Sequence, residues 1–310
     1  MNYTALGKMI KQLRSQKKIS QKKLAQGIMG HNNLSRIEKG QQSVSKEKLD
    51  MIFNRLGHVA TRFFPYPLTE GEFAVYELRD AFNNAQAKSD VDKMASLIKD
   101  MEKLPEFQVG LHKQSLLRDK ACLLLYQDTP DAIAAKQLLY EAIKISIPEF
   151  EINNINTYLL GGDDQEIIAM LAEIAYDAGE GHEAVIILEK LAQNIRKRMS
   201  DSYEKARALT FVLYNLSKYL GKMGQYQKAL DVCNEAIEAG EEYQAYGNLP
   251  SLKFNKAYCY HFLNKNNNEI EPLLYQAYFT ALGLGRHVLA GEILRYADTV
   301  LNIKIKTFPT

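Results

Sequence analysis

The stretch LYNLSKYLGKMGQYQKALDVCNEAI, residues 213–237, predicts two helices that pack against each other. Apolar residues recur at helical spacing on both sides of Gly224, which is placed to turn the chain between the helices. The small side chains of Ser217 and Ala229 would let the two helices approach closely. The residues that carry this register are Leu213, Leu216, Ser217, Leu220, Gly224, Tyr226, Ala229, Cys233 and Ala236.

The same register recurs along the chain at offsets of about 41–45 residues. It resembles a lengthened tetratricopeptide repeat, whose usual period is about 34 residues. The upstream copy contains Leu171, Ala172, Ala175, Gly179, Ala184, Leu188 and Leu191, and the downstream copy contains Ala257, Tyr260, Leu274 and Ala277. Weaker pairs are expected near residues 71–104 and 112–146, and a closing helix near 287–301. With no alternating strand pattern, the sequence predicts an all-α fold in which helical pairs stack as an α-solenoid.

Composition is that of a folded protein of 310 residues, with 46% hydrophobic and 25% charged residues. No apolar run is long enough to span a membrane, and the N-terminus shows no export signal. We therefore expect a cytoplasmic protein without membrane contacts. Cys122, Cys233 and Cys259 are widely spaced in apolar helical surroundings, which predicts buried, reduced thiols.

The charge is unevenly distributed, because residues 1–60 carry a net charge of +9 and the remainder −7. A basic head on an acidic body indicates a polyanionic partner such as DNA. Pro65 and Pro67 interrupt the helical pattern after the head. We expect a DNA-binding domain over residues 1–62, a linker over 63–69, and a repeat domain over 70–310.

Within the head, SQKKLAQGIMGHNNLSRIEKG at residues 20–40 predicts two short helices joined by a tight turn. Such a helix-turn-helix places the first residues of its second helix toward DNA bases in the major groove. Asparagine can bond adenine with two hydrogen bonds, and arginine can do so with guanine. Leu34 and Ile37 would face inward, and Gly30 is acceptable as the residue that caps the second helix.

This stretch resembles the Xre/Cro-type helix-turn-helix in the residues Ser20, Gln21, Leu24, Ala25, Leu34, Ser35, Arg36, Ile37, Glu38 and Gly40. The turn is one residue shorter than in phage repressors. We expect the DNA contacts to come from Gln21, His31, Asn32, Asn33, Ser35 and Arg36. Because a single short helix reads few bases, the sequence also predicts a homodimer on a palindromic operator.

A helix-turn-helix joined to repeats of this length resembles the Rgg/PlcR/PrgX group of the RRNPP superfamily, peptide-pheromone-regulated transcription regulators of Gram-positive bacteria. The resemblance implies that the repeats bind a short signalling peptide and form the dimer interface. It also implies that Asn215 and Asn255, at matching repeat positions, hold the peptide backbone, since an amide both donates and accepts. The expected side-chain pockets are formed by Phe211, Tyr214, Lys218, Tyr219, Phe254, Tyr258, His261 and Phe262.

Two other functions remain open. The repeats could bind a protein partner instead of a peptide, or the chain could be a scaffold or phosphorelay inhibitor with DNA binding secondary. Enzymatic motifs such as HExxH, GxSxG and a phosphate-binding loop are not found in the sequence. We therefore expect no catalytic residues, no metal and no cofactor. The segment GGDD at residues 161–164 is interpreted as a loop that ends with a helix cap.

Overall fold

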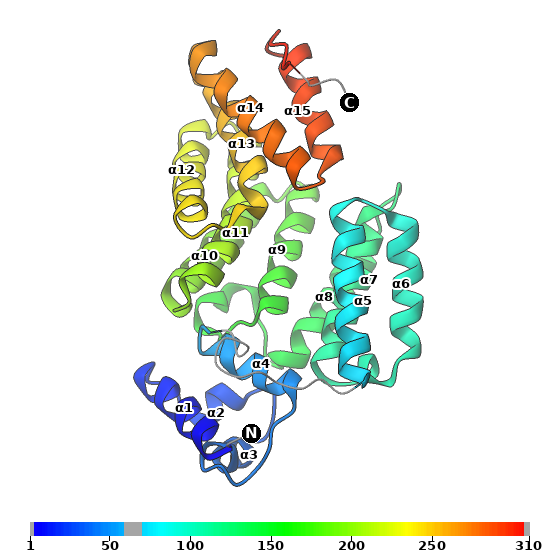
Figure 1. The fold of residues 1–310 in the computed structure, drawn as a ribbon, viewed down its shortest axis with the longest axis vertical. Helices are drawn as coiled ribbons and strands as arrows, with labels where there is room; N and C mark the ends of the chain where they lie inside the picture. The colour runs from blue at the N-terminus through cyan, green and yellow to red at the C-terminus, as the bar shows by residue number, and fades with distance from the viewer. Residues whose placement is uncertain (1–2, 59–69, 307–310) are drawn as a thin grey trace. The chain divides into compact units, whose positions relative to one another are not determined.

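The structure is a computed structural model that describes residues 3–58 and 70–306. Over these residues every regular element is a helix and no strand occurs, so the predicted all-α class is confirmed (Figure 1). The chain divides into two compact units, Met1–Ile174 with Arg196–Asp201, and Ala175–Ile195 with Ser202–Thr310. No helix in the described part of the chain is long and apolar enough to cross a membrane.

The described residues of the head form four short helices, two of which are the helices predicted at residues 20–40. They are α1 (Tyr3–Gln16), α2 (Gln21–Ala25), α3 (His31–Glu38) and α4 (Lys46–Arg55). The Ser20 hydroxyl accepts a hydrogen bond from the Lys23 backbone N–H at 3.1 Å and so starts α2. Ser45 caps α4 in the same way, and Gly57 follows the helix with a φ of +76°, a conformation that suits glycine.

The remaining helices follow as five pairs and a closing helix. The pairs are α5 (Glu70–Ala87) with α6 (Val91–Lys103), α7 (Gly110–Tyr126) with α8 (Ala132–Ser146), α9 (Gly162–Asp177) with α10 (Gly181–Arg198), α11 (Ser202–Lys222) with α12 (Tyr226–Glu242), and α13 (Leu249–Phe262) with α14 (Asn267–Gly283). The closing helix is α15 (His287–Thr299), and the 3₁₀ turns are Pro105–Gln108, Ile152–Thr157 and Tyr246–Asn248. The predicted series of helical pairs is confirmed.

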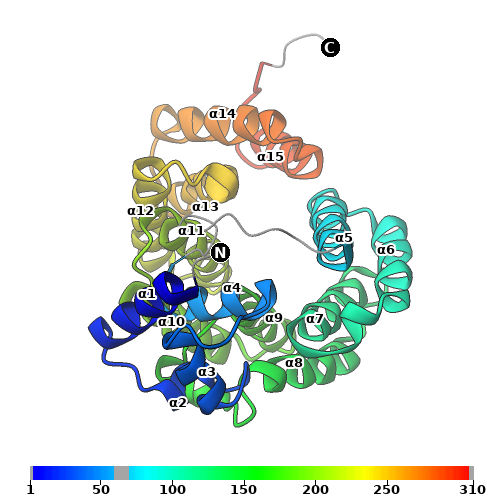
Figure 2. The same cartoon turned by 60° about the horizontal axis from the view of Figure 1, so that its bottom comes forward.

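In the first unit, the core of the head continues into the helices beyond it. Leu24, Leu34 and Ile52 form one cluster with Leu111 of α7 and with Leu159, which follows the 3₁₀ turn Ile152–Thr157. A second cluster joins α5, α6 and α7, and α6 contacts both of the other helices (Figures 1 and 2). The head therefore shares buried apolar surface with α7 and with the segment after α8.

The second unit shows the packing that its sequence predicts. Ser217 of α11 and Ala229 of α12 are fully buried where these two helices contact each other. Gly224 turns the chain between them with a φ of +76°. Cys122, Cys233 and Cys259 are buried free thiols, and burial raises the pKa of each. The predicted linker, residues 63–69, lies outside the described residues.

Candidate DNA interface and ligand cavity

The second short helix of the head, α3, presents polar side chains to solvent and buries its apolar ones. Its first residues His31, Asn32 and Asn33 are exposed, whereas Leu34 and Ile37 are buried in the head. Gly30 precedes the helix in an extended conformation and leaves open space beside its backbone. Ser35 is half-buried.

Arg36 follows on the same helix and is exposed. Its guanidinium makes no hydrogen bond or ion pair with any described residue and is therefore available to a ligand.

A buried ion pair fixes α3 against α1. The Arg14 guanidinium donates to both carboxylate oxygens of Glu38, at 2.6 and 2.9 Å, and the Gln21 amide donates to Glu38 Oε2 at 2.7 Å. Burial acts to raise the pKa of Glu38, but these hydrogen bonds and the Arg14 charge outweigh it and lower that pKa. Gln21, expected at the DNA, is thus held at the start of α2 by Glu38 of α3.

The second unit contains a cavity of about 300 Å³ between α11, α13 and α15. Five of the residues expected to bind a peptide line it: Tyr214, Lys218, Phe254, Asn255 and Tyr258. The cavity is mainly apolar, with polar groups at a few points, as small-ligand sites usually are. Its remaining lining residues are Ser217, Gly221, Lys222, Ser251, Cys259, Leu289, Glu292 and Tyr296.

The two matched asparagines have different surroundings. Asn255 Nδ2 donates to Ser217 Oγ at 2.9 Å and to the Tyr214 carbonyl at 3.4 Å, so its amide joins α13 to α11. Its Oδ1 accepts no hydrogen bond from the described residues. Asn215 Nδ2 donates to the Phe211 carbonyl one turn earlier, at 3.2 Å, and Asn215 does not line the cavity.

The other aromatic residues expected in the pockets lie around the cavity without lining it. Tyr219 is buried and stacks on Tyr176 with 4.3 Å between ring centroids. Phe262 stacks on Tyr226 at 4.6 Å, and His261 meets the Phe262 ring edge-on. Phe211 is half-buried. These contacts stabilise the helix packing beside the cavity.

Comparison with known proteins agrees with this arrangement. Residues 10–64 match the family model HTH_3, helix-turn-helix. The head is a helix-turn-helix domain. No curated protein matches the chain.

Two solved proteins share the fold of nearly the whole chain. PlcR of Bacillus thuringiensis, in complex with the peptide PapR7 and DNA, is 17% identical over 94% of this chain and 99% of that chain, with a TM-score of 0.63. The apo form of the competence regulator ComR of Streptococcus vestibularis is 17% identical over 98% and 100%, with a TM-score of 0.52. The fold expected from the resemblance to the RRNPP regulators is confirmed.

Arg55 joins the helix-turn-helix domain to α8. Its Nη1 donates to the carbonyls of Leu24 and Gln26, at the end of α2, and its Nη2 donates to the Ser146 carbonyl at 2.9 Å. The side chain is buried, and burial lowers its pKa. Because carbonyls at helix ends carry partial negative charge, this is a favourable place for a buried cation.

Gly27 lies beside Arg55 in the turn after α2 and has a φ of +71°. A Cβ on Gly27 would lie 1.8 Å from the Ser146 carbonyl oxygen. The turn therefore approaches α8 too closely for any side chain.

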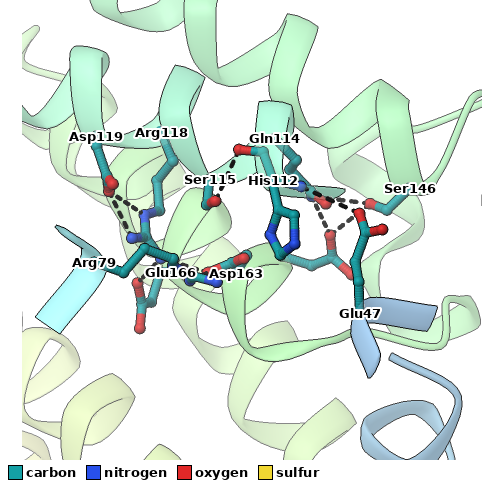
Figure 3. Close-up of polar contacts among 11 residues, drawn as sticks. Glu47, Arg79, His112, Gln114, Ser115, Arg118, Asp119, Ser146, Asp163 and Glu166 are labelled. Carbon is teal, nitrogen blue, oxygen red and sulfur yellow. Dashed lines mark hydrogen bonds and ion pairs between the residues drawn. The ribbon is translucent and has the colours of Figure 1, made fainter. Parts of the chain in front are cut away.

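A buried polar network continues from Ser146. The Asp164 carboxylate of α9 accepts hydrogen bonds from the Ser146 hydroxyl, from Gln114 Nε2 at 2.6 Å, and from the Gly161 N–H at 2.8 Å. Figure 3 shows Gln114 and Ser146 at this point. Burial raises the pKa of Asp164, although Arg55 and these hydrogen bonds oppose the rise.

A second cluster in Figure 3 surrounds Arg118 of α7, which is buried. Arg118 bonds Asp119 on its own helix, and Asp163 and Glu166 on α9. Arg79 of α5 donates to the same Asp163 at 2.7 Å. Burial acts to raise the pKa of Asp163, but the charges of Arg79 and Arg118 outweigh it and lower that pKa. The cluster fixes α5, α7 and α9 to one another.

Glu47 makes a second connection between the helix-turn-helix domain and α7. Its carboxylate accepts hydrogen bonds from the backbone N–H groups of Leu111 and His112 in the first turn of α7. A carboxylate is favourable there because the first N–H groups of a helix lack helical partners. Figure 3 shows Glu47 and His112 at this junction.

The sequence interpretation missed the wall of the cavity formed by α15. Leu289, Glu292 and Tyr296 line the cavity from this helix, which was predicted only as a closing element. The Tyr296 hydroxyl is buried with no hydrogen-bond partner among the described residues, and burial raises its pKa. The order of the helices could have indicated this wall, because α11, α13 and α15 are each the first helix of successive repeats.

Proposed function

We propose that this protein is a cytoplasmic transcription regulator that binds operator DNA through its helix-turn-helix domain and a short signalling peptide through its repeats. The main observation in favour of DNA binding is that the first residues of α3 are polar and exposed, while Leu34 and Ile37 of the same helix are buried in the core of the head. PlcR, which shares this fold, was solved with both a peptide and DNA. We assign the DNA contacts to residues 1–62 and the peptide contacts to residues 70–310.

The cavity between α11, α13 and α15 supports the peptide assignment. A bound peptide brings N–H and carbonyl groups that need partners once water is excluded. Asn255 Oδ1 and the Tyr296 hydroxyl both lack a partner among the described residues, while Phe254, Tyr258 and Leu289 supply apolar surface. Such a site binds one apolar side chain of a peptide together with part of its backbone.

We propose that the regulator acts as a homodimer on a palindromic operator. One α3 helix reads only a few base pairs, and two helices placed one helical turn apart read a symmetric site. We assign the dimer contacts to the repeats, since the apolar side chains of the small head are largely used in its own core.

Replacing Arg36 by alanine is expected to reduce the preference for operator over random DNA by about 1–3 kcal/mol, because an arginine that bonds guanine carries sequence information. The measurement is a titration of the full chain with both duplexes, the operator being selected from a random pool. Lys48→Ala, an exposed residue of α4, is the control. An unchanged preference would indicate that Arg36 contacts a phosphate of the DNA backbone, and it would contradict base reading by Arg36.

Replacing Asn255 by alanine is expected to weaken peptide binding about tenfold or more, since a peptide N–H left without a partner costs about 1–3 kcal/mol. Calorimetry of the full chain with synthetic peptides encoded beside the gene measures this. Asn234→Ala, an exposed asparagine of α12, is the matched control and should bind normally.

Asn215→Ala separates two modes of peptide binding. Asn215 lies outside the cavity, so its replacement should weaken only a peptide that extends beyond the cavity along α11. If all three variants bind equally well, the cavity is not the peptide site.

A further inference from the structure

The end of α10 is fixed onto the helix-turn-helix domain. Lys17 Nζ, just after α1, donates to the Arg198 carbonyl and to Ser200 Oγ, both at 2.7 Å. The Gly57 carbonyl, just after α4, accepts from the N–H groups of Ser200 and Asp201 at 3.1 and 2.9 Å. A Cβ on Gly57 would lie 2.5 Å from the Arg198 carbonyl oxygen. The backbone of residues 198–201 is thereby held against the domain at two points.

Lys23 of α2 lies beside Lys197 and Arg198 of α10 at this contact, and Lys22 adjoins Lys23 in the chain. Lys22 and Lys23 on α2, and Lys197 and Arg198 at the end of α10, form no ion pair with any described residue. Lys22, Lys23 and Lys197 are exposed. Arg198 is half-buried, and its Nε is buried with no hydrogen-bond partner in the part of the chain that the structure describes.

These charges lie close enough to oppose one another. Burial lowers the pKa of Lys23, and the neighbouring charges of Arg198 and Lys197 lower it further. Burial also lowers the pKa of Arg198. Glu149 and Glu151 line the same cavity as Lys22 and Lys23 in the first unit but form no ion pair with them. Neighbouring positive charges without acidic partners repel one another and destabilise the folded protein, and a bound anion relieves this repulsion.

We propose that Lys23, Lys197 and Arg198 form a phosphate-binding patch that holds the DNA backbone beside the half-site contacted by α3. The inference rests on the proposed DNA binding and adds to it a contact from the repeats. In a helix-turn-helix the first helix crosses the DNA backbone, and this helix is α2, which carries Lys23. A basic patch that extends from α2 therefore lies next to the DNA backbone, where its phosphates continue beyond the half-site.

The chemistry of the patch fits DNA phosphates. Lysine and arginine bind phosphate through charge and N–H groups without reading sequence, and each phosphate that they neutralise releases counterions. The patch should therefore change the salt dependence of DNA binding and leave sequence preference unchanged.

The test compares the unmodified protein with the double variant Lys197→Gln/Arg198→Gln, both as full chains. Affinity is measured against salt concentration on a long duplex that contains the selected operator and on one trimmed to the base pairs under α3. On the long duplex, the slope of log affinity against log salt should become shallower by about 0.9 for each phosphate that the variant no longer neutralises. The preference for operator over random DNA should not change, and the trimmed duplex should show no difference between the two proteins.

Two control variants make the result specific. Lys99→Gln/Lys136→Gln removes the same charge from exposed positions on α6 and α8 and should leave the slope unchanged. Lys197→Arg/Arg198→Lys keeps both charges and should keep the slope of the original protein. Thermal melts of all variants show that each is folded.

An unchanged slope in Lys197→Gln/Arg198→Gln overturns the patch, as does an equal change in either control. If Arg36→Ala leaves the operator preference intact while the patch variant still lowers the slope, base reading by α3 fails and the patch stands. If the patch variant alters operator preference at an unchanged slope, the segment acts on the domain's structure and the proposal is wrong.

Discussion

Replacing Arg55 by methionine should lower the free energy of unfolding of the first unit by about 3 kcal/mol or more. The change removes the donors for the carbonyls of Leu24, Gln26 and Ser146. Each buried carbonyl left without a partner costs about 1–3 kcal/mol, whereas methionine retains most of the apolar packing of the arginine stem. The expected decrease is a large fraction of the stability of an ordinary domain.

Urea denaturation of the full chain measures this decrease, and amide hydrogen exchange in the turn after α2 locates it. Arg207→Met is the matched control, because Arg207 is exposed and, among the described residues, forms its ion pair with Glu204 on its own helix. Exposed pairs contribute at most about 1 kcal/mol. A change smaller than about 1 kcal/mol in Arg55→Met, with unchanged exchange in the turn, would show that water or neighbouring groups replace the three hydrogen bonds.

Replacing Glu38 by glutamine should destabilise the head by about 3 kcal/mol, because removing one partner of a buried ion pair leaves the other charge uncompensated. Arg14 and Glu38 have side chains that are only 14% and 2% exposed, so little solvent screens the pair. The amide of glutamine can accept only one of the two hydrogen bonds that Arg14 now donates to the carboxylate.

The same variant should also remove part of the acid sensitivity of the head. The pKa of Glu38 is lower in the folded protein than in the unfolded chain, so its contribution is complete above the unfolded value of about 4.3. The contribution is lost as the pH falls through the folded pKa. Thermal melts of both proteins between neutral and acidic pH measure the difference, which should shrink as the pH falls. A constant difference would show that Glu38 acts through its shape and not its charge.

Local patterns in the sequence predicted much of this fold. The alternation of small and large residues around Gly224 fixed the α11–α12 pair, because helix packing depends on which side chains recur every three or four residues. The inward position of Leu34 and Ile37 followed from the same periodicity. Each of these features is determined within about 25 residues of chain.

The buried polar network was not predictable in this way. Arg55 stands at the end of a short helix, where an arginine is usually exposed, and its partners are backbone carbonyls that have no sequence signature. GGDD was interpreted as a loop that ends with a helix cap, yet α9 begins at Gly162, and Asp164 is the buried acceptor for Gln114 and Ser146. These contacts join residues far apart in the chain, so only the packed structure brings them together.

The residues that line the cavity were also predicted only in part. Tyr214, Phe254 and Tyr258 were predicted because they lie near Asn215 and Asn255, whose positions match between repeats. Tyr296 was missed because α15 has no second helix after it to complete the pattern. The position of Asn255 was predicted, but its bond to Ser217 was not, since a side chain that both joins helices and faces a cavity has no distinct spacing.

The surface of α3 has a consequence for how the proposed DNA binding can be changed. The side chains of His31, Asn32, Asn33 and Arg36 form no hydrogen bond or ion pair with any other described residue. Glu38 holds α3 to α1, while Arg55 and Gly27 hold the end of α2 against α8. A library that randomises only the exposed positions should yield folded proteins at high frequency. One that includes Gly27 should yield mostly insoluble protein. A protein that reads DNA through α3, as we propose, could then acquire a new operator preference by substitutions at these four positions, without compensating changes in its core.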